Sequence, residues 1–111
     1  AQAGESSSSI RDRVVKAHKT QEERFKSHPG IHCNAQMSSR MIHQYAEPDD
    51  SGLNMLRTAM TRLNLSARAY DRILKVARTI ADIEGSEHVL LPHLAEAISY
   101  RNLDRGDWAE R

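Results

Sequence analysis

The fold is decided by residues 66–85, whose sequence is SARAYDRILKVARTIADIEG. Their apolar side chains recur at steps of three and four residues, which is the spacing of one face of an α-helix. Ser66 is of a residue type that caps helix N-termini, and Gly85 readily adopts the left-handed conformation that ends a helix. The stretch therefore predicts an amphipathic helix with an apolar face made of Tyr70, Ile73, Leu74, Ala77, Ile80 and Ala81.

Three further helical patterns precede this helix. The first begins at Ile10, after serines that can cap it, and ends at the His-Pro-Gly turn of residues 28–30. A short helix is expected from the serine pair 38–39 and a longer one from the aspartate pair 49–50, because both residue types cap helices. The first helix has a mostly apolar stripe made of Ile10, Val14, Ala17, Gln21 and Phe25.

One more helix is expected after a short apolar connector at residues 89–91. Pro92 suits its first turn, and the pattern predicts an end near Tyr100 or Arg101, followed by a charged tail that frays from Asp104 onward. Together the patterns predict an all-α fold, a compact bundle of four to five helices. The expected core consists of Leu56, Leu63, Ile73, Leu74, Ile80, Leu94 and Ile98.

The composition agrees with a single small helical domain. The chain has 111 residues, and aromatic residues make up only 5% of them, so aliphatic side chains must fill the core. We divide it into a linker or cut end at residues 1–9, an arm with a short helix at 10–46, the main bundle at 47–105 and a tail at 106–111.

The charge and the cysteine count exclude several classes of protein. A net charge of +1 is far from that of a dedicated nucleic-acid binder, and the single cysteine cannot form an internal disulfide. No stretch has the length and apolarity of a membrane span or the pattern of a signal peptide, so a soluble, cytoplasmic protein without a membrane partner is expected. Glycine-rich phosphate loops are also missing from the sequence, so most of any nucleotide site must lie elsewhere.

Arg68 occupies an unusual position for a cation. If Ser66 caps the helix, Arg68 lies in its first turn, where the helix dipole disfavours positive charge by about 0.3 to 1 kcal/mol. One explanation is an external anion such as a phosphate, held by Arg68 and the helix terminus. The alternative is an ordinary ion pair with Asp71, three residues further on. Arg72 and Lys75 share the face of Arg68.

Charge is unevenly distributed over the central helices. Residues 57–78 include six Lys and Arg but one Asp, whereas residues 79–98 include four acids and no Lys or Arg. Such a dipolar surface suits docking between charged partners, among them neighbouring subunits of an assembly. A plain solvated face is the alternative interpretation.

His28, His32 and Cys33 form the other cluster of reactive side chains. A zinc site needs about four ligands in a closed arrangement, and the sequence offers no second cysteine or paired histidine motif to complete one. We therefore predict no metal site. Cys33 has no orienting partner that would make it a nucleophile, so the role of the cluster stays open.

The run from residue 63 to residue 87, together with residues 93–101, resembles the C-terminal domain of magnesium-chelatase-related AAA+ ATPases of the ComM competence type. Upstream, Gly4-Glu-Ser-Ser, Ile10-Arg-x-Arg-Val and Asn34-Ala-Gln also match that family. The resemblance extends over nearly the whole chain, from about Gly4 to Arg105.

The resemblance implies that this chain is the helical lid that follows the ATPase core in a longer parent protein. In that family the arginine that opens the corresponding lid helix is the sensor-2 residue, which reaches toward the γ-phosphate of ATP. By position this residue is Arg68, and Arg72, one turn further along, is a second candidate. ATP and Mg²⁺ would be bound by the full-length parent and not by this fragment alone.

The Walker motifs, the catalytic glutamate and the arginine finger of the family have no match in this chain. The fragment is therefore not expected to be an enzyme, whereas the parent is expected to be an ATPase. The resemblance implies a hexameric ring, with the core of the same chain and neighbouring subunits as partners, and DNA processing by branch migration. The alternative is a free-standing helical binding module that uses its basic surface for nucleic acid or protein partners.

Overall fold

The computed structural model describes the backbone of residues 7–109 and the side chains of residues 7–100. Over this range the chain is helical, without a strand, and measures 39 × 37 × 32 Å along its principal axes. The predicted all-α bundle is confirmed. The elements are α1 (Ser7–Arg24), the 3₁₀ turn η2 (Asn34–Gln36), α2 (Ser39–Tyr45), α3 (Asp50–Leu63), α4 (Ala67–Glu84) and α5 (Leu91–Ala109).

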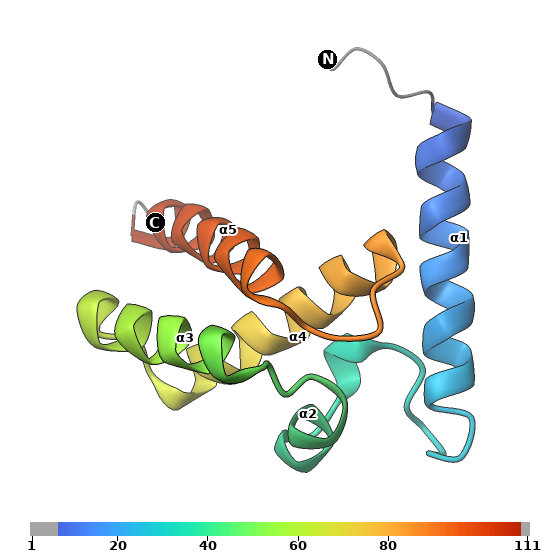
Figure 1. The fold of residues 1–111 in the computed structure, drawn as a ribbon, viewed down its shortest axis with the longest axis horizontal. Coiled ribbons are helices and arrows are strands. Elements are labelled where there is room, and N and C mark those ends of the chain that lie inside the picture. Colours follow the sequence, from blue (N-terminus) through green and yellow to red (C-terminus); the bar gives the residue numbers. More distant parts are fainter. Residues whose placement is uncertain (1–6, 110–111) are drawn as a thin grey trace.

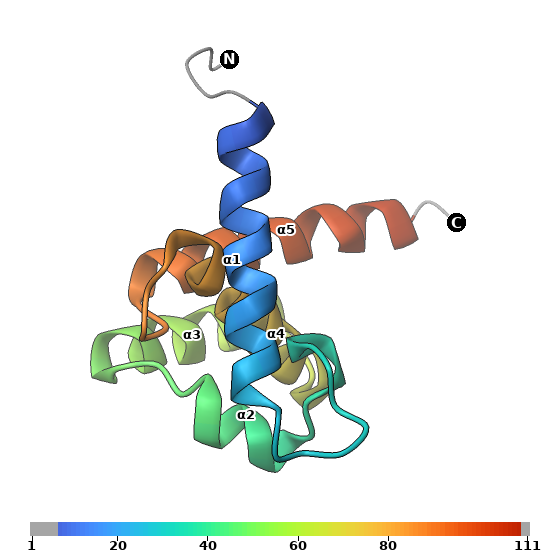
Figure 2. The ribbon, with the colours of Figure 1, turned by 90° about the vertical axis from the view of Figure 1, so that its right-hand side faces the viewer.

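Helix α4 is the centre of the molecule. It packs against α1, η2, α2 and α5, and α3 packs against α5 (Figure 1). Helix α1 crosses one side of α4, and its first turns project beyond the rest of the bundle (Figure 2). None of the helices in the described range is both long and apolar enough to cross a membrane.

The predicted helix caps are confirmed. The Ser66 hydroxyl accepts a hydrogen bond from the Ala69 backbone N–H at 3.2 Å, and Ser38 and Asp49 cap α2 and α3 in the same way. Gly85 ends α4 with φ +81°, the left-handed conformation expected of it. Local hydrogen bonds to short polar side chains therefore determine where three of the helices begin.

The predicted core is right for four of its seven residues. Leu56, Ile73, Leu74 and Leu94 are buried, whereas Leu63, Ile80 and Ile98 are only half-buried. Leu63 is the last residue of α3, and Ile80 lines an open groove on the surface of α4. Ile98 packs against the edge of the core. Their place in the core is taken by side chains from α2 and the connecting segments, namely Phe25, Met37, Met41, Ile42 and Val89.

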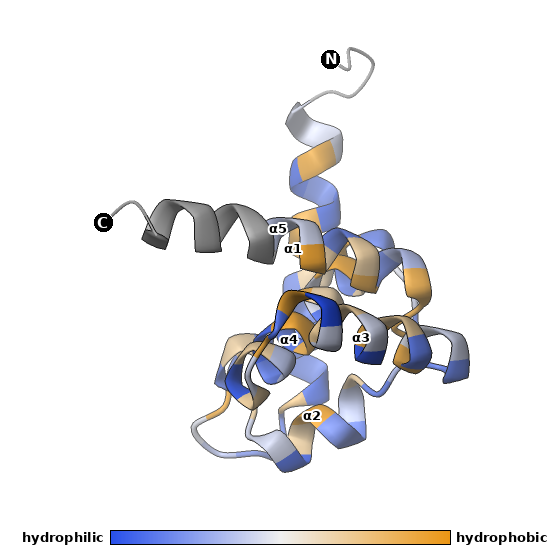
Figure 3. Cartoon of the chain, turned by 90° about the vertical axis from the view of Figure 1, so that its left-hand side faces the viewer, coloured by the Kyte–Doolittle hydropathy of each residue, from blue (hydrophilic) through white to orange (hydrophobic). Residues whose placement is uncertain are grey.

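The predicted stripe of α1 is buried only in its second half. Ala17, Gln21 and Phe25 are buried, but Ile10 and Val14 are exposed by 46% and 37%. The first turns of α1 extend past the end of α4, so the described chain leaves Ile10 and Val14 largely uncovered. Apolar segments are visible on this projecting part of α1 (Figure 3).

The predicted end of the last helix near Tyr100 or Arg101 is wrong, because α5 continues to Ala109. The continuation contains no proline and a single glycine, Gly106, which costs about 1 kcal/mol and does not stop a helix. At the other end α1 begins at Ser7, inside the predicted linker. Residues 1–6 and 110–111 lie outside the described residues, and the division into linker, arm, bundle and tail stays a prediction.

Candidate functional site

Arg68 is the second residue of α4 and lies two residues after the capping Ser66. Its side chain is exposed, and no residue in the described part of the chain forms a hydrogen bond or an ion pair with it. The alternative partner, Asp71, instead accepts a hydrogen bond from the Ser39 hydroxyl at 2.7 Å. Of the two explanations that the sequence left open, the ion pair with Asp71 is not formed, and the guanidinium remains exposed.

Two neighbours fix the rotation of α4 that exposes Arg68. Ile73 is buried with 1% of its surface exposed, and Tyr70 is half-buried against the same core. Burial raises the pKa of the Tyr70 hydroxyl above its ordinary value, and the Glu47 carboxylate raises it further. The Tyr70 ring packs against the core, and this contact holds the opposite face of α4 in solvent.

Arg72 lies one turn further along α4 and is also exposed. Unlike Arg68, it already takes part in an interaction. Arg68 is therefore the better placed of the two predicted residues to take an external phosphate.

Position alone does not single out Arg68, because Arg40 has the same place in α2. It is the second residue after the capping Ser38, its side chain is exposed, and it has no hydrogen-bond or ion-pair partner among the described residues. The two arginines differ in their helices, since α2 has 7 residues and α4 has 18. Arg40 is consequently a close structural control for Arg68.

A buried polar network lies further along α4, and the sequence analysis missed it. The Asp82 carboxylate is fully buried and accepts two hydrogen bonds from Arg24, from Nη2 to Oδ1 at 2.8 Å and from Nη1 to Oδ2 at 2.9 Å. Asn34 donates to the same Oδ2 at 2.9 Å. This network ties α1 and η2 to α4.

Arg78 completes the network from the other side of Asp82. Its Nη2 lies 3.1 Å from Asp82 Oδ1 and donates to the Ser86 carbonyl at 2.7 Å, while Nη1 donates to the carbonyls of Tyr45 and Glu87. Burial lowers the pKa of Arg78, and the Asp82 carboxylate opposes that shift. One side chain thereby joins the end of α2, the middle of α4 and the loop before α5.

The network corrects the predicted charge distribution. Arg78 and Asp82 were assigned to the basic and acidic surfaces, but both are buried and paired with each other. The i,i+4 spacing of the two residues, each directly after an alanine of the apolar stripe, indicates an ion pair but not its burial. Exposed basic residues remain at 57, 62, 68 and 72, and exposed acids at 84, 87 and 96.

His93 is a second buried polar residue that sequence reasoning missed. Its Nδ1 accepts a hydrogen bond from the Leu90 backbone N–H at 3.0 Å, so its Nε2 carries the proton and donates to Glu84 Oε1 at 2.8 Å. His93 therefore connects the end of α4 to the first turn of α5, and this contact is structural.

His28, His32 and Cys33 line one surface hollow, but their side chains have different surroundings. His28 lies 3.0 Å from the Tyr45 hydroxyl and packs edge-on against Phe25, whereas His32 is exposed and Cys33 is half-buried. Within residues 7–100 no group of three or more His, Cys, Asp or Glu side chains is arranged to hold a metal ion.

Comparison with known proteins identifies the family. The family model described as "Magnesium chelatase, subunit ChlI C-terminal" matches residues 4–101. This chain belongs to that family. The chain is 41% identical over 102 residues to the competence protein ComM of Haemophilus influenzae, which covers 92% of the chain. It is 42% identical over 105 residues to the uncharacterized protein YifB of Salmonella typhimurium, and 41% identical over 102 residues to YifB of Escherichia coli.

The predicted resemblance to a ComM-type C-terminal domain is therefore confirmed. The chain spans about a fifth of the length of these relatives, 19% of ComM and 20% of the Salmonella protein. The family match therefore identifies this chain as the C-terminal domain of an AAA+ protein. The magnesium chelatase family is related to ATPases.

Proposed function

We propose that this chain is the helical lid of an AAA+ ATPase, and that Arg68 is its sensor-2 arginine. In the parent, Arg68 contacts the γ-phosphate of ATP held by the preceding ATPase core. The observation that carries the proposal is the position of Arg68, an exposed guanidinium without a partner in the described chain, held at the start of α4 by the burial of Ile73.

The chemistry of this position fits a phosphate group. A phosphate oxygen next to the first turn of α4 would offset the unfavourable placement of a cation there, and it would accept charge-assisted hydrogen bonds from Arg68. Such a hydrogen bond contributes about 1.5 to 3 kcal/mol. Mg²⁺ and the remaining phosphate contacts would come from the core, because this chain has no glycine-rich phosphate loop.

For the parent we propose a ring of six subunits that processes DNA, with ATP hydrolysis driving branch migration. The support is the similarity to a relative that is named a competence protein, and the dipolar distribution of exposed charge on α3, α4 and α5. Opposite charges on one domain suit head-to-tail contacts between neighbouring subunits.

A second candidate function is binding of nucleic acid by the exposed arginines at positions 57, 62, 68 and 72. Binding of that kind weakens steeply as salt rises, because each phosphate contact releases a counterion. The sensor-2 role instead predicts an effect confined to ATP turnover, so the two functions are separable.

The test compares Arg68→Ala with Arg40→Ala in the full-length parent. We expect Arg68→Ala to slow ATP turnover at least tenfold, because about 1.4 kcal/mol of lost transition-state stabilisation corresponds to one factor of ten. Arg40→Ala removes the same charge from the same helix position and should leave turnover unchanged. Equal turnover in the two variants, at equal thermal stability, would reduce Arg68 to an ordinary surface arginine.

A further inference from the structure

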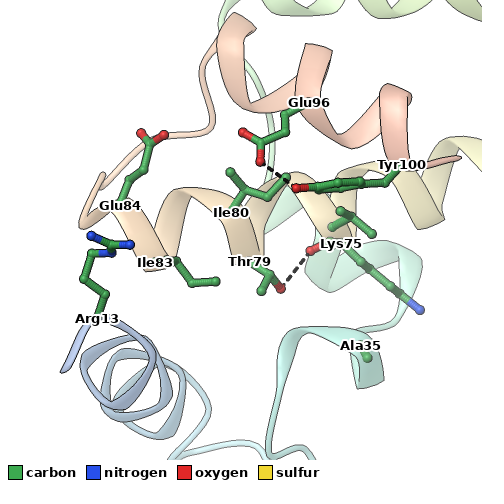
Figure 4. Close-up of a pocket in the computed structure, with 10 residues that line it drawn as sticks. Arg13, Ala35, Lys75, Thr79, Ile80, Ile83, Glu84, Glu96 and Tyr100 are labelled. Atoms are coloured by element: carbon green, nitrogen blue, oxygen red, sulfur yellow. Dashed lines mark hydrogen bonds between the residues drawn. The ribbon is translucent and has the colours of Figure 1, made fainter. Parts of the chain in front are cut away.

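A groove of about 630 Å³ lies between α1, α4 and α5, away from Arg68 (Figure 4). Its floor is formed by Val76, Ile80 and Ile83, which are half-buried and come from successive turns of α4. The ring of Tyr100 lies along one edge, and its hydroxyl donates to Glu96 at 3.0 Å. The groove is thus an apolar channel with polar edges on the surface of the domain.

The groove continues along α1 into uncovered apolar surface. A smaller hollow of about 230 Å³ shares Ala35, Thr79 and Ile83 with the groove and reaches Val14 of α1. One turn before Val14, on the same face of α1, Ile10 is exposed by 46%. Apolar surface that is continuous over two elements marks an interaction site more often than scattered exposed residues do.

The projecting turns of α1 bury little surface in this structure. None of the side chains of residues 7–16 is buried, and most of the stability of a helix in a protein comes from packing of its apolar face. A partner that covers the groove and this part of α1 would stabilise both.

The position of the chain in its relatives indicates which partner this is. The family is a C-terminal domain and spans about a fifth of its relatives, so most of the parent precedes α1 and is joined to the chain on the N-terminal side of that helix. A partner tethered next to the projecting turns has a high effective concentration at the groove. The groove lining has two basic residues, Arg13 and Lys75, and two acidic residues, Glu84 and Glu96, so it lacks the excess of positive charge that a nucleic-acid site needs.

We propose that the α1/α4/α5 groove is the surface on which the preceding domain of the parent docks, through an apolar segment that covers Ile80, Ile83 and Val14. The proposal rests on the proposed lid function but not on the role of Arg68. Movement of that domain would therefore act directly on α4, the helix that carries Arg68 at its other end.

The test measures thiol reactivity in the full-length parent, in a background with Cys33→Ser and without other reactive cysteines. Ala35→Cys places a thiol at an exposed position of the groove, and Thr58→Cys places one at an exposed position of α3, across the bundle from α1 (Figure 1). At a protein concentration where the parent is monomeric, we expect maleimide to modify Ala35→Cys at least tenfold more slowly than Thr58→Cys. Rates within twofold of each other would overturn the proposal.

Two further arms identify the occupant. Tyr100→Glu should raise the reactivity of Ala35→Cys at least threefold, whereas Ser99→Glu, exposed on the same helix but outside the groove lining, should not. Protection that appears only as the protein concentration rises would show that a second copy covers the groove, and would also overturn the proposal. If the groove is unprotected but Arg68→Ala slows ATP turnover, the docking proposal is wrong and the sensor-2 proposal stands. If the groove is protected but Arg68→Ala has normal ATP turnover, the sensor-2 proposal is wrong and the docking proposal stands.

Discussion

Two arginines on the same helix have opposite surroundings. Arg68, at the start of α4, is exposed and without a partner in the described chain, whereas Arg78, ten residues later, is 3% exposed and donates to three backbone carbonyls and Asp82. The side chains are chemically identical, so the difference comes from their angular position on the helix and from what packs there. A buried arginine whose two terminal nitrogens are both hydrogen-bonded is a structural element, and one left in solvent at a helix start can bind a ligand.

The largest expected effect concerns the buried arginine. We expect Arg78→Ala to lower the free energy of unfolding of the 111-residue chain by about 3 to 5 kcal/mol. It removes the donor to the carbonyls of Tyr45, Ser86 and Glu87, and it leaves Arg24 as the one cation paired with the buried Asp82 in the described chain. Urea denaturation followed by circular dichroism measures this, with Arg40→Ala as the control for loss of an exposed arginine. A decrease of less than 1 kcal/mol in the Arg78→Ala variant would show that the network is not a structural element.

The smallest expected effect on stability concerns Arg68 itself. We expect Arg68→Ala to leave the unfolding free energy unchanged or to raise it by about 0.3 to 1 kcal/mol, because it removes a cation from the first turn of a helix. Arg40→Ala should behave in the same way, since it occupies the same position in α2. A clear loss of stability in Arg68→Ala alone, in the same urea titrations, would mean that Arg68 has an internal partner and would weaken the contrast with Arg78.

Features set by local hydrogen bonds could be predicted from the sequence. Ser38, Asp49 and Ser66 each accept from a backbone N–H three residues on, and Gly85 ends α4, because these effects depend only on neighbours in the chain. The exposure of Arg68 could also be predicted, because the helical periodicity of residues 66–85 places it opposite the apolar face.

Features set by distant contacts could not be predicted. Asp82 meets Arg24 and Asn34, which lie 58 and 48 residues away, and its spacing from Arg78 is equally typical of a surface ion pair. The exposure of Ile10 and Val14 depends on how far α1 extends beyond α4, and the apolar stripe of α1 contains no information on that length. The groove could not be predicted either, because it forms where α1, α4 and α5 separate, and that arrangement depends on contacts between residues far apart in the sequence.

The central claim, that Arg68 contacts the γ-phosphate, is tested most directly by comparing the affinities of the full-length parent for ATP and ADP. ADP lacks the γ-phosphate, so Arg68→Ala should weaken ATP binding about tenfold, which corresponds to about 1.4 kcal/mol, and leave ADP binding unchanged. Arg40→Ala should change neither dissociation constant. Loss of affinity for both nucleotides to the same extent, or for neither, would contradict the account.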